Sequence, residues 1–186
     1  RKPMFSKFIS IITTVILSIS NLYGQQTLRR AFQPVNVVNK IPYRNNPQVG
    51  HYVQTKDAKI YYEVYGKGQP IVLLHGGLFG SIIEFADFID QLKGQYQVIA
   101  ISTRGHSKSE LGTKPLTFEQ RANDAMTVIN AVTKDSVIVL GFSDGGYSAY
   151  KFGAMYPARV KKMIVIGAGE IRPGLREFKF TAKMAM

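Results

Sequence analysis

The 186-residue sequence contains no cysteine, which excludes a disulfide, a thiolate metal site and a cysteine nucleophile from any mechanism. Acidic residues are also scarce, because 12 Asp and Glu stand against 24 Lys and Arg and the formal net charge is +12. Such a charge would suit an anionic partner. The basic residues are spread along the chain, however, and form no stripe interleaved with aromatic residues, the pattern that single-strand binders use. We therefore expect no nucleic-acid partner.

A long hydrophobic run is missing as well. The uncharged stretch at residues 8–20, rich in Ile, Val and Leu, is about 13 residues, whereas a helix that crosses a bilayer needs about 20. It follows a basic head at residues 1–7 and precedes a polar exit at residues 21–25, an order typical of a secretory signal peptide. We expect cleavage near Gly24, a secreted or periplasmic protein, and no stable membrane span after cleavage. A buried hydrophobic helix and an uncleaved membrane anchor are the alternatives.

Residues 25–50 carry three prolines and show no sustained period, so they are predicted to be an extended leader to a domain at residues 51–170. Within this domain, β-rich runs alternate with amphipathic helical runs. The first two runs predict an antiparallel hairpin. The later alternation predicts right-handed crossovers and a mainly parallel sheet covered on both faces, which is the α/β class. The predicted strands are 51–55, 59–65, 71–74, 97–101, 136–140 and 162–166, and the predicted helices are 81–93, 117–132 and 144–156.

Two of the predicted helices begin with the spacing of a capping box, in which a Ser or Thr and a Glu or Gln three residues later satisfy N–H groups of the first turn. The pairs are Ser81 with Glu84 and Thr117 with Gln120. An apolar stripe follows each pair, so each helix is expected to bury one face. The stripes consist of Ile82, Phe85, Phe88, Ile89 and Leu92, and of Ala122, Ala125, Met126, Ile129 and Val132.

The segment that indicates chemistry is Gly141-Phe142-Ser143-Asp144-Gly145, a Gly-x-Ser-x-Gly motif between a predicted strand and a predicted helix. The motif requires this context, because a sharp strand-to-helix turn forces the serine into strained backbone angles and exposes its Oγ at the carboxyl end of the sheet. Ser143 is therefore the candidate nucleophile, at a helix N-terminus that favours a developing negative charge. A plain β–α turn is the alternative.

Acyl transfer also needs two preorganised N–H donors for the oxyanion, one from the residue after the nucleophile and one from the loop after an earlier strand. Asp144 and Gly77 occupy these positions, the latter in the sequence His75-Gly76-Gly77 that follows the run at 71–74. A glycine turn that lets the chain leave the strand is the alternative for this pair of glycines. The two segments together favour the catalytic interpretation.

Four motifs in this order resemble the first half of the α/β-hydrolase fold, in its esterase, lipase and iminopeptidase group. They are His75-Gly76-Gly77 after the third strand, Arg104-Gly105-His106-Ser107-Lys108-Ser109 after the fourth, Gly141-Phe142-Ser143-Asp144-Gly145 after the fifth, and Tyr156-Pro157-Ala158-Arg159-Val160 before the sixth. The group usually carries Asp where Ser102 stands and Gly where Ser107 stands, at positions that shape the loop beside the site. The chemistry that the resemblance implies calls for no metal and no organic cofactor.

The resemblance further implies a triad in the order Ser, acid, His, and this sequence has no histidine after Ser143. Its histidines are at 51, 75 and 106, and His75 is interpreted as structural. Because a serine hydroxyl without a base is a weak nucleophile, we expect an incomplete chain without full activity. Residues 171–186 resemble the start of a cap. Glu170 is a minor candidate for the triad acid, with a solvated loop carboxylate as the alternative.

The leading hypothesis is a secreted serine hydrolase that acts on a small carboxylic ester or related acyl substrate through an acyl-enzyme. Ser143 is its nucleophile, and Gly77 and Asp144 supply the oxyanion donors. An aminopeptidase-like peptidase and a cofactor-free haloperoxidase are rivals of the same fold. Outside this class, the missing histidine motivates a non-catalytic binding protein or an inactive fragment. No pattern in the sequence indicates the substrate or the oligomeric state.

Overall fold

The computed structural model of the chain describes residues 40–169. The predicted signal peptide at 1–24, the predicted start of a cap at 171–186 and Glu170 lie outside this range. The strands are β1 (Gly50–Gln54), β2 (Lys59–Tyr65), β3 (Gln69–Leu74), β4 (Tyr96–Ile101), β5 (Val137–Phe142) and β6 (Val160–Ile166). The helices are α2 (Ala86–Leu92), α3 (Phe118–Val132) and α4 (Asp144–Met155), with short 3-10 turns η1 (Ile82–Phe85) and η2 (Pro157–Arg159). Each predicted strand is present, with small shifts at its ends.

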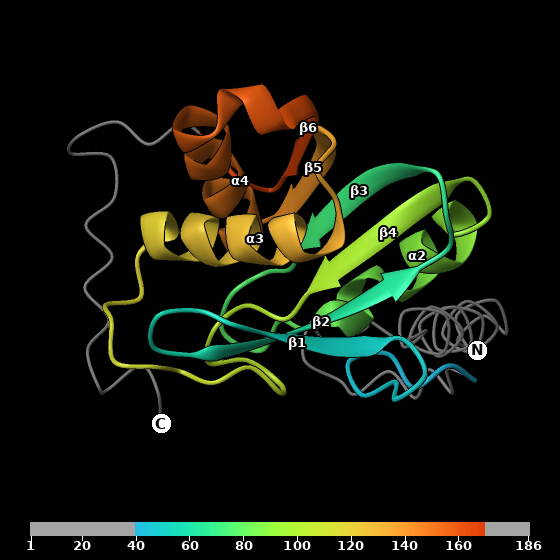
Figure 1. Cartoon of the computed structure of the whole chain (residues 1–186), viewed down its shortest axis with the longest axis horizontal. Coiled ribbons are helices and arrows are strands. Elements are labelled where there is room, and N and C mark those ends of the chain that lie inside the picture. Colours follow the sequence, from blue (N-terminus) through green and yellow to red (C-terminus); the bar gives the residue numbers. More distant parts are fainter. Residues whose placement is uncertain (1–39, 170–186) are drawn as a thin grey trace, which may run out of the picture. The chain divides into compact units, whose positions relative to one another are not determined.

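The strands form one sheet in the order β1-β2-β4-β3-β5-β6. The pairs β1–β2 and β2–β4 are antiparallel, and the pairs β3–β4, β3–β5 and β5–β6 are parallel. The predicted mainly parallel sheet with an antiparallel hairpin at its edge is confirmed. After β4 the chain crosses back over β3 to form β5, so the strand order reverses between β3 and β5 (Figure 1). In open α/β sheets, ligands bind beside such a switch point at the carboxyl ends of the strands.

Both faces of the sheet are covered, as β3 shows residue by residue. Val72 and Leu74 belong to a core shared with α3 and α4, whereas Ile71 and Leu73 belong to a second core shared with η1 and α2. All four side chains are buried. Alternate side chains of a strand point to opposite faces, so a strand covered on both sides needs a continuous apolar run. Figure 1 shows α3 and α4 side by side along one face.

The first helical segment begins differently from the prediction. It opens with the 3-10 turn η1, and the Ser81 side chain accepts no hydrogen bond from that turn, so the predicted capping box is wrong. The Glu84 carboxylate instead accepts a hydrogen bond from the N–H of Gly76, at 2.9 Å. Phe88, predicted to lie in the buried stripe, is 44% exposed. Glu84 therefore binds the loop after β3 and does not cap the helical segment.

The second capping box is half formed. The Thr117 hydroxyl accepts the N–H of Gln120 at 3.0 Å at the start of α3, as predicted. The Gln120 side chain does not return to the cap and donates to Asp124 instead. Ala122, Ala125 and Ile129 of the predicted stripe are buried.

Residues 40–49, predicted to belong to an extended leader, form turns that pack against the domain. Tyr43 is buried, and its hydroxyl donates to Asp90 of α2 at 2.7 Å. The fully buried carboxylate of Glu63 in β2 accepts the N–H groups of Arg44 and Asn46. The described part of the predicted leader thus packs against the domain that was predicted to begin at residue 51.

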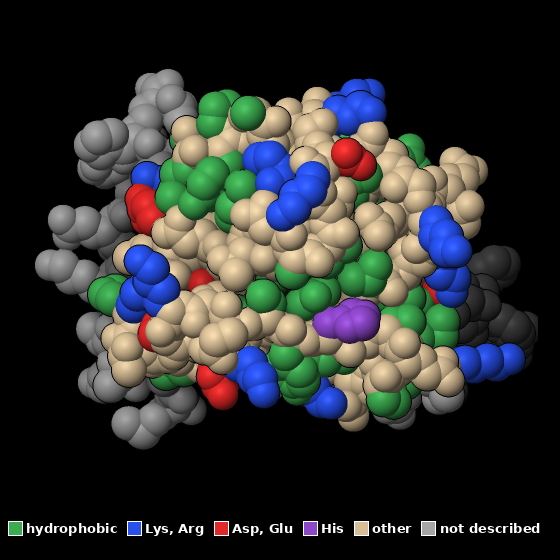
Figure 2. Space-filling model, in the orientation of Figure 1, with side chains coloured by type: hydrophobic (Ala, Val, Ile, Leu, Met, Phe, Trp, Pro, Cys, Tyr) green, Lys and Arg blue, Asp and Glu red, His purple; other side chains and the backbone are tan. Residues whose placement is uncertain are grey.

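One face of the domain carries dispersed charge. On the face drawn in Figure 2, Lys and Arg side chains are scattered among other residue types and form no continuous stripe. No helix within residues 40–169 has both the length and the apolar character needed to cross a membrane.

Candidate active site

Ser143 lies at the turn between β5 and α4, with φ of 52° and ψ of −113°. Such a conformation costs a non-glycine residue about 1–3 kcal/mol and persists only where the surroundings enforce it. Here the Ser143 N–H donates to the Ile166 carbonyl of β6 at 2.7 Å, and the Ser143 carbonyl accepts the Gly146 N–H at 2.9 Å. The strained turn that the Gly-x-Ser-x-Gly motif predicts is confirmed.

Two glycines make this turn sterically possible. A Cβ on Gly141 would lie 2.3 Å from the carbonyl oxygen of Gly145, and a Cβ on Gly145 would lie 2.0 Å from the carbonyl oxygen of Leu74. No side chain fits at either position. The second contact shows that the first turn of α4 lies directly against the end of β3, so the loop after β3 is brought to the serine.

Gly77 and Asp144, the predicted oxyanion donors, are neighbours in space. A Cβ built on Gly77 would lie 3.1 Å from the Cβ of Asp144. Asp144 is the first residue of α4, where an N–H has no acceptor inside the helix and the helix dipole favours negative charge. Neither N–H donates to a protein acceptor in the part of the chain that the structure describes. Two such groups on adjacent segments are what an oxyanion hole requires.

Both ring nitrogens of His75 form hydrogen bonds with groups other than Ser143. Its Nε2 accepts the Thr103 N–H at 3.0 Å, so the proton is assigned to Nδ1, which donates to the Gly76 carbonyl at 2.7 Å. Burial lowers the pKa of His75 to about 4, and the nearby charges of His106 and Arg121 act in the same direction. His75 is therefore neutral at pH 7, which fits the structural role predicted for it.

The other two histidines also have partners away from Ser143. His106 packs edge-on against His75 with ring centroids 5.0 Å apart, and its Nδ1 lies 3.2 Å from Thr103 Oγ1. His51, in β1, stacks near Tyr62 and is separated from β5 by three strands of the sheet. Among residues 40–169, then, no histidine hydrogen bonds to Ser143. The same range holds no group of three or more His, Asp or Glu side chains suited to a metal ion.

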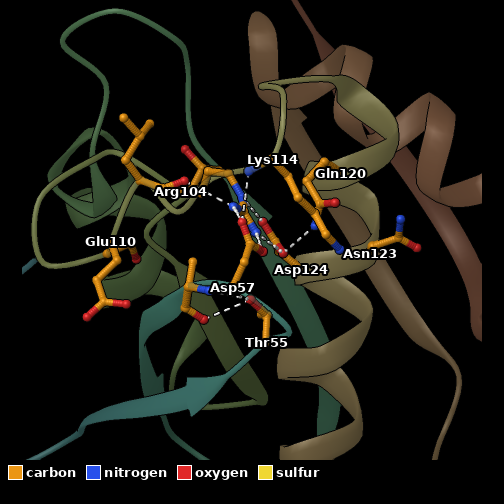
Figure 3. Close-up of polar contacts among 12 residues, drawn as sticks. Thr55, Asp57, Arg104, Glu110, Lys114, Gln120, Asn123 and Asp124 are labelled. Atoms are coloured by element: carbon orange, nitrogen blue, oxygen red, sulfur yellow. Dashed lines mark hydrogen bonds and ion pairs between the residues drawn. The ribbon is translucent and has the colours of Figure 1, made fainter.

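Arg104, from the motif after β4, forms a buried ionic cluster that the sequence did not reveal (Figure 3). Its guanidinium makes two forked pairs, with Asp124 at 2.8 and 2.9 Å and with Asp57 at 2.9 and 3.1 Å. A fifth hydrogen bond goes to the Leu111 carbonyl at 3.0 Å, so all five N–H donors are used. Hydrogen bonds from Arg104 hold the pKa of Asp57 well below its usual range. The cluster joins the β1–β2 turn, the loop after β4 and α3.

The two departures from the usual motif lie in the same loop after β4. Ser107 has a φ of 49°, a conformation that the glycine common at this position adopts without strain. Its hydroxyl donates to the Arg44 carbonyl at 3.3 Å. Ser102 is fully buried, and its hydroxyl donates to the His106 carbonyl at 2.9 Å. Both side chains bind backbone groups, which agrees with a role in shaping the loop.

Several known proteins are similar to this chain over about three fifths of its length. Serine hydrolase BPHL of Homo sapiens is 33% identical over 123 residues, which cover 62% of this chain and 42% of that protein. Proline iminopeptidase PfmaB of Pestalotiopsis fici is 34% identical over 122 residues, which cover 62% and 43%. The solved structure of the N-acyl homoserine lactonase AidH, complexed with N-butanoyl homoserine, matches with a TM-score of 0.59 at 25% identity over 63% of this chain and 44% of that one.

The chain spans less than half the length of these relatives. A family described as the alpha/beta hydrolase fold matches residues 69–184. This range contains the switch point, the glycine loop after β3 and the serine turn after β5. The sequence match and the strand order therefore agree, and the chain belongs to the alpha/beta hydrolase fold family.

Proposed function

We propose that the protein is a serine hydrolase that cleaves small carboxylic esters or related acyl substrates. Ser143 Oγ attacks the carbonyl carbon, a general base takes its proton, and the leaving alcohol departs with a proton to give an acyl-serine that water then hydrolyses. The observation that carries the proposal is the meeting of three groups at the carboxyl ends of β3 and β5. They are the strained Ser143 and the backbone N–H groups of Gly77 and Asp144, which have no acceptor among the described residues.

The general base is the part of this mechanism that residues 40–169 do not supply. Family members place their histidine after the serine, and residues 144–186 contain none. The tests below therefore use the product of the complete reading frame. A peptidase is the second candidate, because the relative named as a proline iminopeptidase is 34% identical.

The nucleophile is tested with a fluorophosphonate, which mimics the tetrahedral intermediate and reacts only with an activated serine beside an oxyanion pocket. We expect one labelled residue, Ser143, and loss of both labelling and ester hydrolysis in Ser143→Ala. Labelling of Ser107 or Ser109, or normal turnover by Ser143→Ala, would refute the assignment although the fold stands. Absence of labelling and of ester or peptide hydrolysis in the complete protein would favour a non-catalytic binding protein.

The oxyanion donors are tested by removing one N–H. Gly77→Pro deletes the donor, and Gly77→Ala is the matched control because it adds a Cβ at the same place, 3.1 Å from the Asp144 Cβ, and keeps the N–H. Loss of one such donor typically lowers turnover by about 10²–10³. We expect this factor between the two variants. Asp144→Asn should have a much smaller effect, since only its backbone N–H is used, although its carboxylate lies against Arg121.

We further propose that the protein is exported, because the basic head and short apolar run of residues 1–20 have the form of a signal peptide. N-terminal sequencing of the protein from its native cells should find a chain that begins near Gln25, outside the cytoplasm. An intact chain in the cytosol would contradict this.

A further inference from the structure

Hydrogen bonds engage the backbone groups on both sides of the Gly77 N–H. The Gly76 N–H donates to the Glu84 carboxylate at 2.9 Å, and the Gly76 carbonyl accepts from His75 Nδ1 at 2.7 Å. The Gly77 carbonyl accepts the Gly80 N–H at 2.9 Å, which closes a turn. Gly76 and Gly77 have four polar backbone groups, and within the described range only the Gly77 N–H lacks a hydrogen-bond partner. Because polar backbone groups in folded proteins are nearly always paired, this N–H is the one polar backbone group of the two glycines left open to an oxygen of a ligand.

The His75 hydrogen bond sets the direction of the Gly77 N–H. The Gly76 carbonyl and the Gly77 N–H belong to one planar trans peptide and point in opposite directions, so holding the carbonyl also holds the N–H. His75 is itself held by the Thr103 N–H in the loop after β4. Glycine at position 80 keeps the contact open, because a Cβ there would lie 2.0 Å from the Gly76 carbonyl oxygen and 2.9 Å from His75 Nδ1.

Glu84 holds the preceding peptide from η1. Its side chain is exposed, and its Oε2 would lie 3.3 Å from a Cβ on Gly76, so the carboxylate is packed against the glycine backbone. The start of η1 has no side-chain cap although a carboxylate stands at the capping-box position. The carboxylate therefore binds the loop after β3 in place of its own 3-10 turn.

We propose that His75 and Glu84 are positioning residues that together aim the Gly77 N–H at the oxyanion. His75 holds the carbonyl side of the Gly76–Gly77 peptide, and Glu84 holds the peptide before it. Neither residue touches the substrate. This inference rests on the proposed function, because it assigns the N–H a role only if Ser143 generates an oxyanion.

The exposed position of Glu84 makes it the cleaner residue to vary. In the complete protein, Glu84→Ala should lower kcat for p-nitrophenyl acetate about 10-fold or more and leave KM within about twofold, because a misdirected donor fails mainly in the transition state. Glu84→Gln keeps an oxygen acceptor and should recover most of kcat. Asp87→Ala is the matched control, since it removes an exposed carboxylate one turn later that makes no side-chain hydrogen bond or ion pair within residues 40–169. The affinity for phenylboronic acid, which forms a tetrahedral adduct with serine, should fall with kcat.

His75 allows its two contacts to be separated. His75→Asn places an amide near the Nδ1 position and can still donate to the Gly76 carbonyl, whereas His75→Gln places an acceptor near Nε2 and keeps only the tie to Thr103. The proposal requires the Asn variant to retain more kcat than the Gln variant. If His75 only ties the two loops together, His75→Gln should retain more kcat than His75→Asn, or kcat and thermal stability should fall equally in each variant.

The outcomes separate this inference from the proposed function. Wild-type kcat and wild-type fluorophosphonate labelling in Glu84→Ala would overturn the positioning role while Ser143 remains the nucleophile. Labelling that maps to another serine would overturn the proposed function itself. A fall in kcat that Glu84→Gln does not recover, with thermal stability falling in parallel, would also overturn the positioning role, because it would indicate damage to the fold.

Discussion

Replacing Arg104 by Met would remove the cation from the centre of the cluster that it forms with Asp57 and Asp124. The guanidinium is fully buried and Asp124 is 3% exposed, so water cannot readily replace the lost hydrogen bonds. Removing one partner of a buried ion pair typically costs about 3–5 kcal/mol, because the remaining charge is left uncompensated. We expect the free energy of unfolding at pH 7 to fall by about this amount, far more than the roughly 0–1 kcal/mol of an exposed ion pair.

The loss should depend on pH in a defined direction. Arg104 holds the pKa of Asp57 well below its usual range, so the unfolded chain binds more protons than the folded chain as the pH falls below about 4. The stabilisation is therefore present above the unfolded pKa and is lost as the pH falls toward the folded pKa. In Arg104→Met, Asp57 lacks this stabilisation at every pH, so acidification cannot remove it. The difference in unfolding free energy between wild type and Arg104→Met should shrink below about pH 4.

Urea unfolding of the complete protein at neutral pH and at about pH 3.5 would measure both quantities. Arg44→Met is the matched control, because the same atoms change on an exposed arginine that has no ion pair in the described part of the chain. Such surface substitutions stay within about 0.5 kcal/mol. A loss of less than about 1 kcal/mol for Arg104→Met at neutral pH would refute the reasoning, since the cluster would then be worth no more than a surface pair. An equal loss at both pH values would refute the linkage argument.

The other predictions concern His75, Glu63 and the edge strand β6. Burial lowers the pKa of His75 to about 4, so between about pH 6.5 and pH 4 the unfolded chain binds a proton that the folded chain does not. The free energy of unfolding should therefore fall as the pH drops through this range. Urea unfolding at several pH values should show a smaller slope of this free energy against pH in His75→Gln. Glu63 accepts four hydrogen bonds in full burial, so Glu63→Gln, which turns an amide toward these donors, should lose about 1–3 kcal/mol in thermal unfolding; an unchanged midpoint would count against it. Because β6 is an edge strand that exposes Ile164 and Ile166, residues 25–186 alone should associate in size-exclusion chromatography, and a cooperatively unfolding monomer would contradict this.

Local signals explain why so much of the fold could be predicted. The run Ile71–Leu74 is apolar at every position because β3 is covered on both faces, and the glycines around Ser143 are required by contacts as short as 2.0 Å. Each feature involves residues adjacent in the sequence, so the pattern and the structural cause coincide. The mainly parallel pairing followed from the crossover rule, which needs only the alternation of strands and helices.

The errors arose where one pattern serves two structures. The spacing of Ser81 and Glu84 fits a capping box, but the carboxylate binds Gly76, which lies eight residues earlier and outside the helix. The segment at 40–49 has no period, and its packing depends on the carboxylates of Asp90 and Glu63, which are distant in the sequence. No local pattern distinguishes these cases.

The cluster of Arg104 could not be predicted for a related reason. Asp124 and Asp57 are 20 and 47 residues away from the arginine, and only the finished sheet brings the β1–β2 turn against α3. Sequence indicated the motif around Arg104 but not its partners. Ion pairs between segments that are not neighbours in the chain are therefore found only after the topology is known.

The oxyanion donor at Gly77 shows a further limit of prediction from sequence. Its N–H is free for a ligand because hydrogen bonds occupy the neighbouring backbone groups of Gly76 and Gly77. The Gly76 N–H, the Gly76 carbonyl and the Gly77 carbonyl must each find a partner before the Gly77 N–H stands out as the group left for a ligand. Those partners come from the end of β3, from η1 and from the turn at Gly80. A motif can place a glycine at the right point of the fold, but the direction of its N–H depends on side chains that the motif does not contain. We therefore expect substitutions of His75, Gly80 and Glu84 to change turnover more than ground-state binding, although none of these residues belongs to the Gly-x-Ser-x-Gly motif.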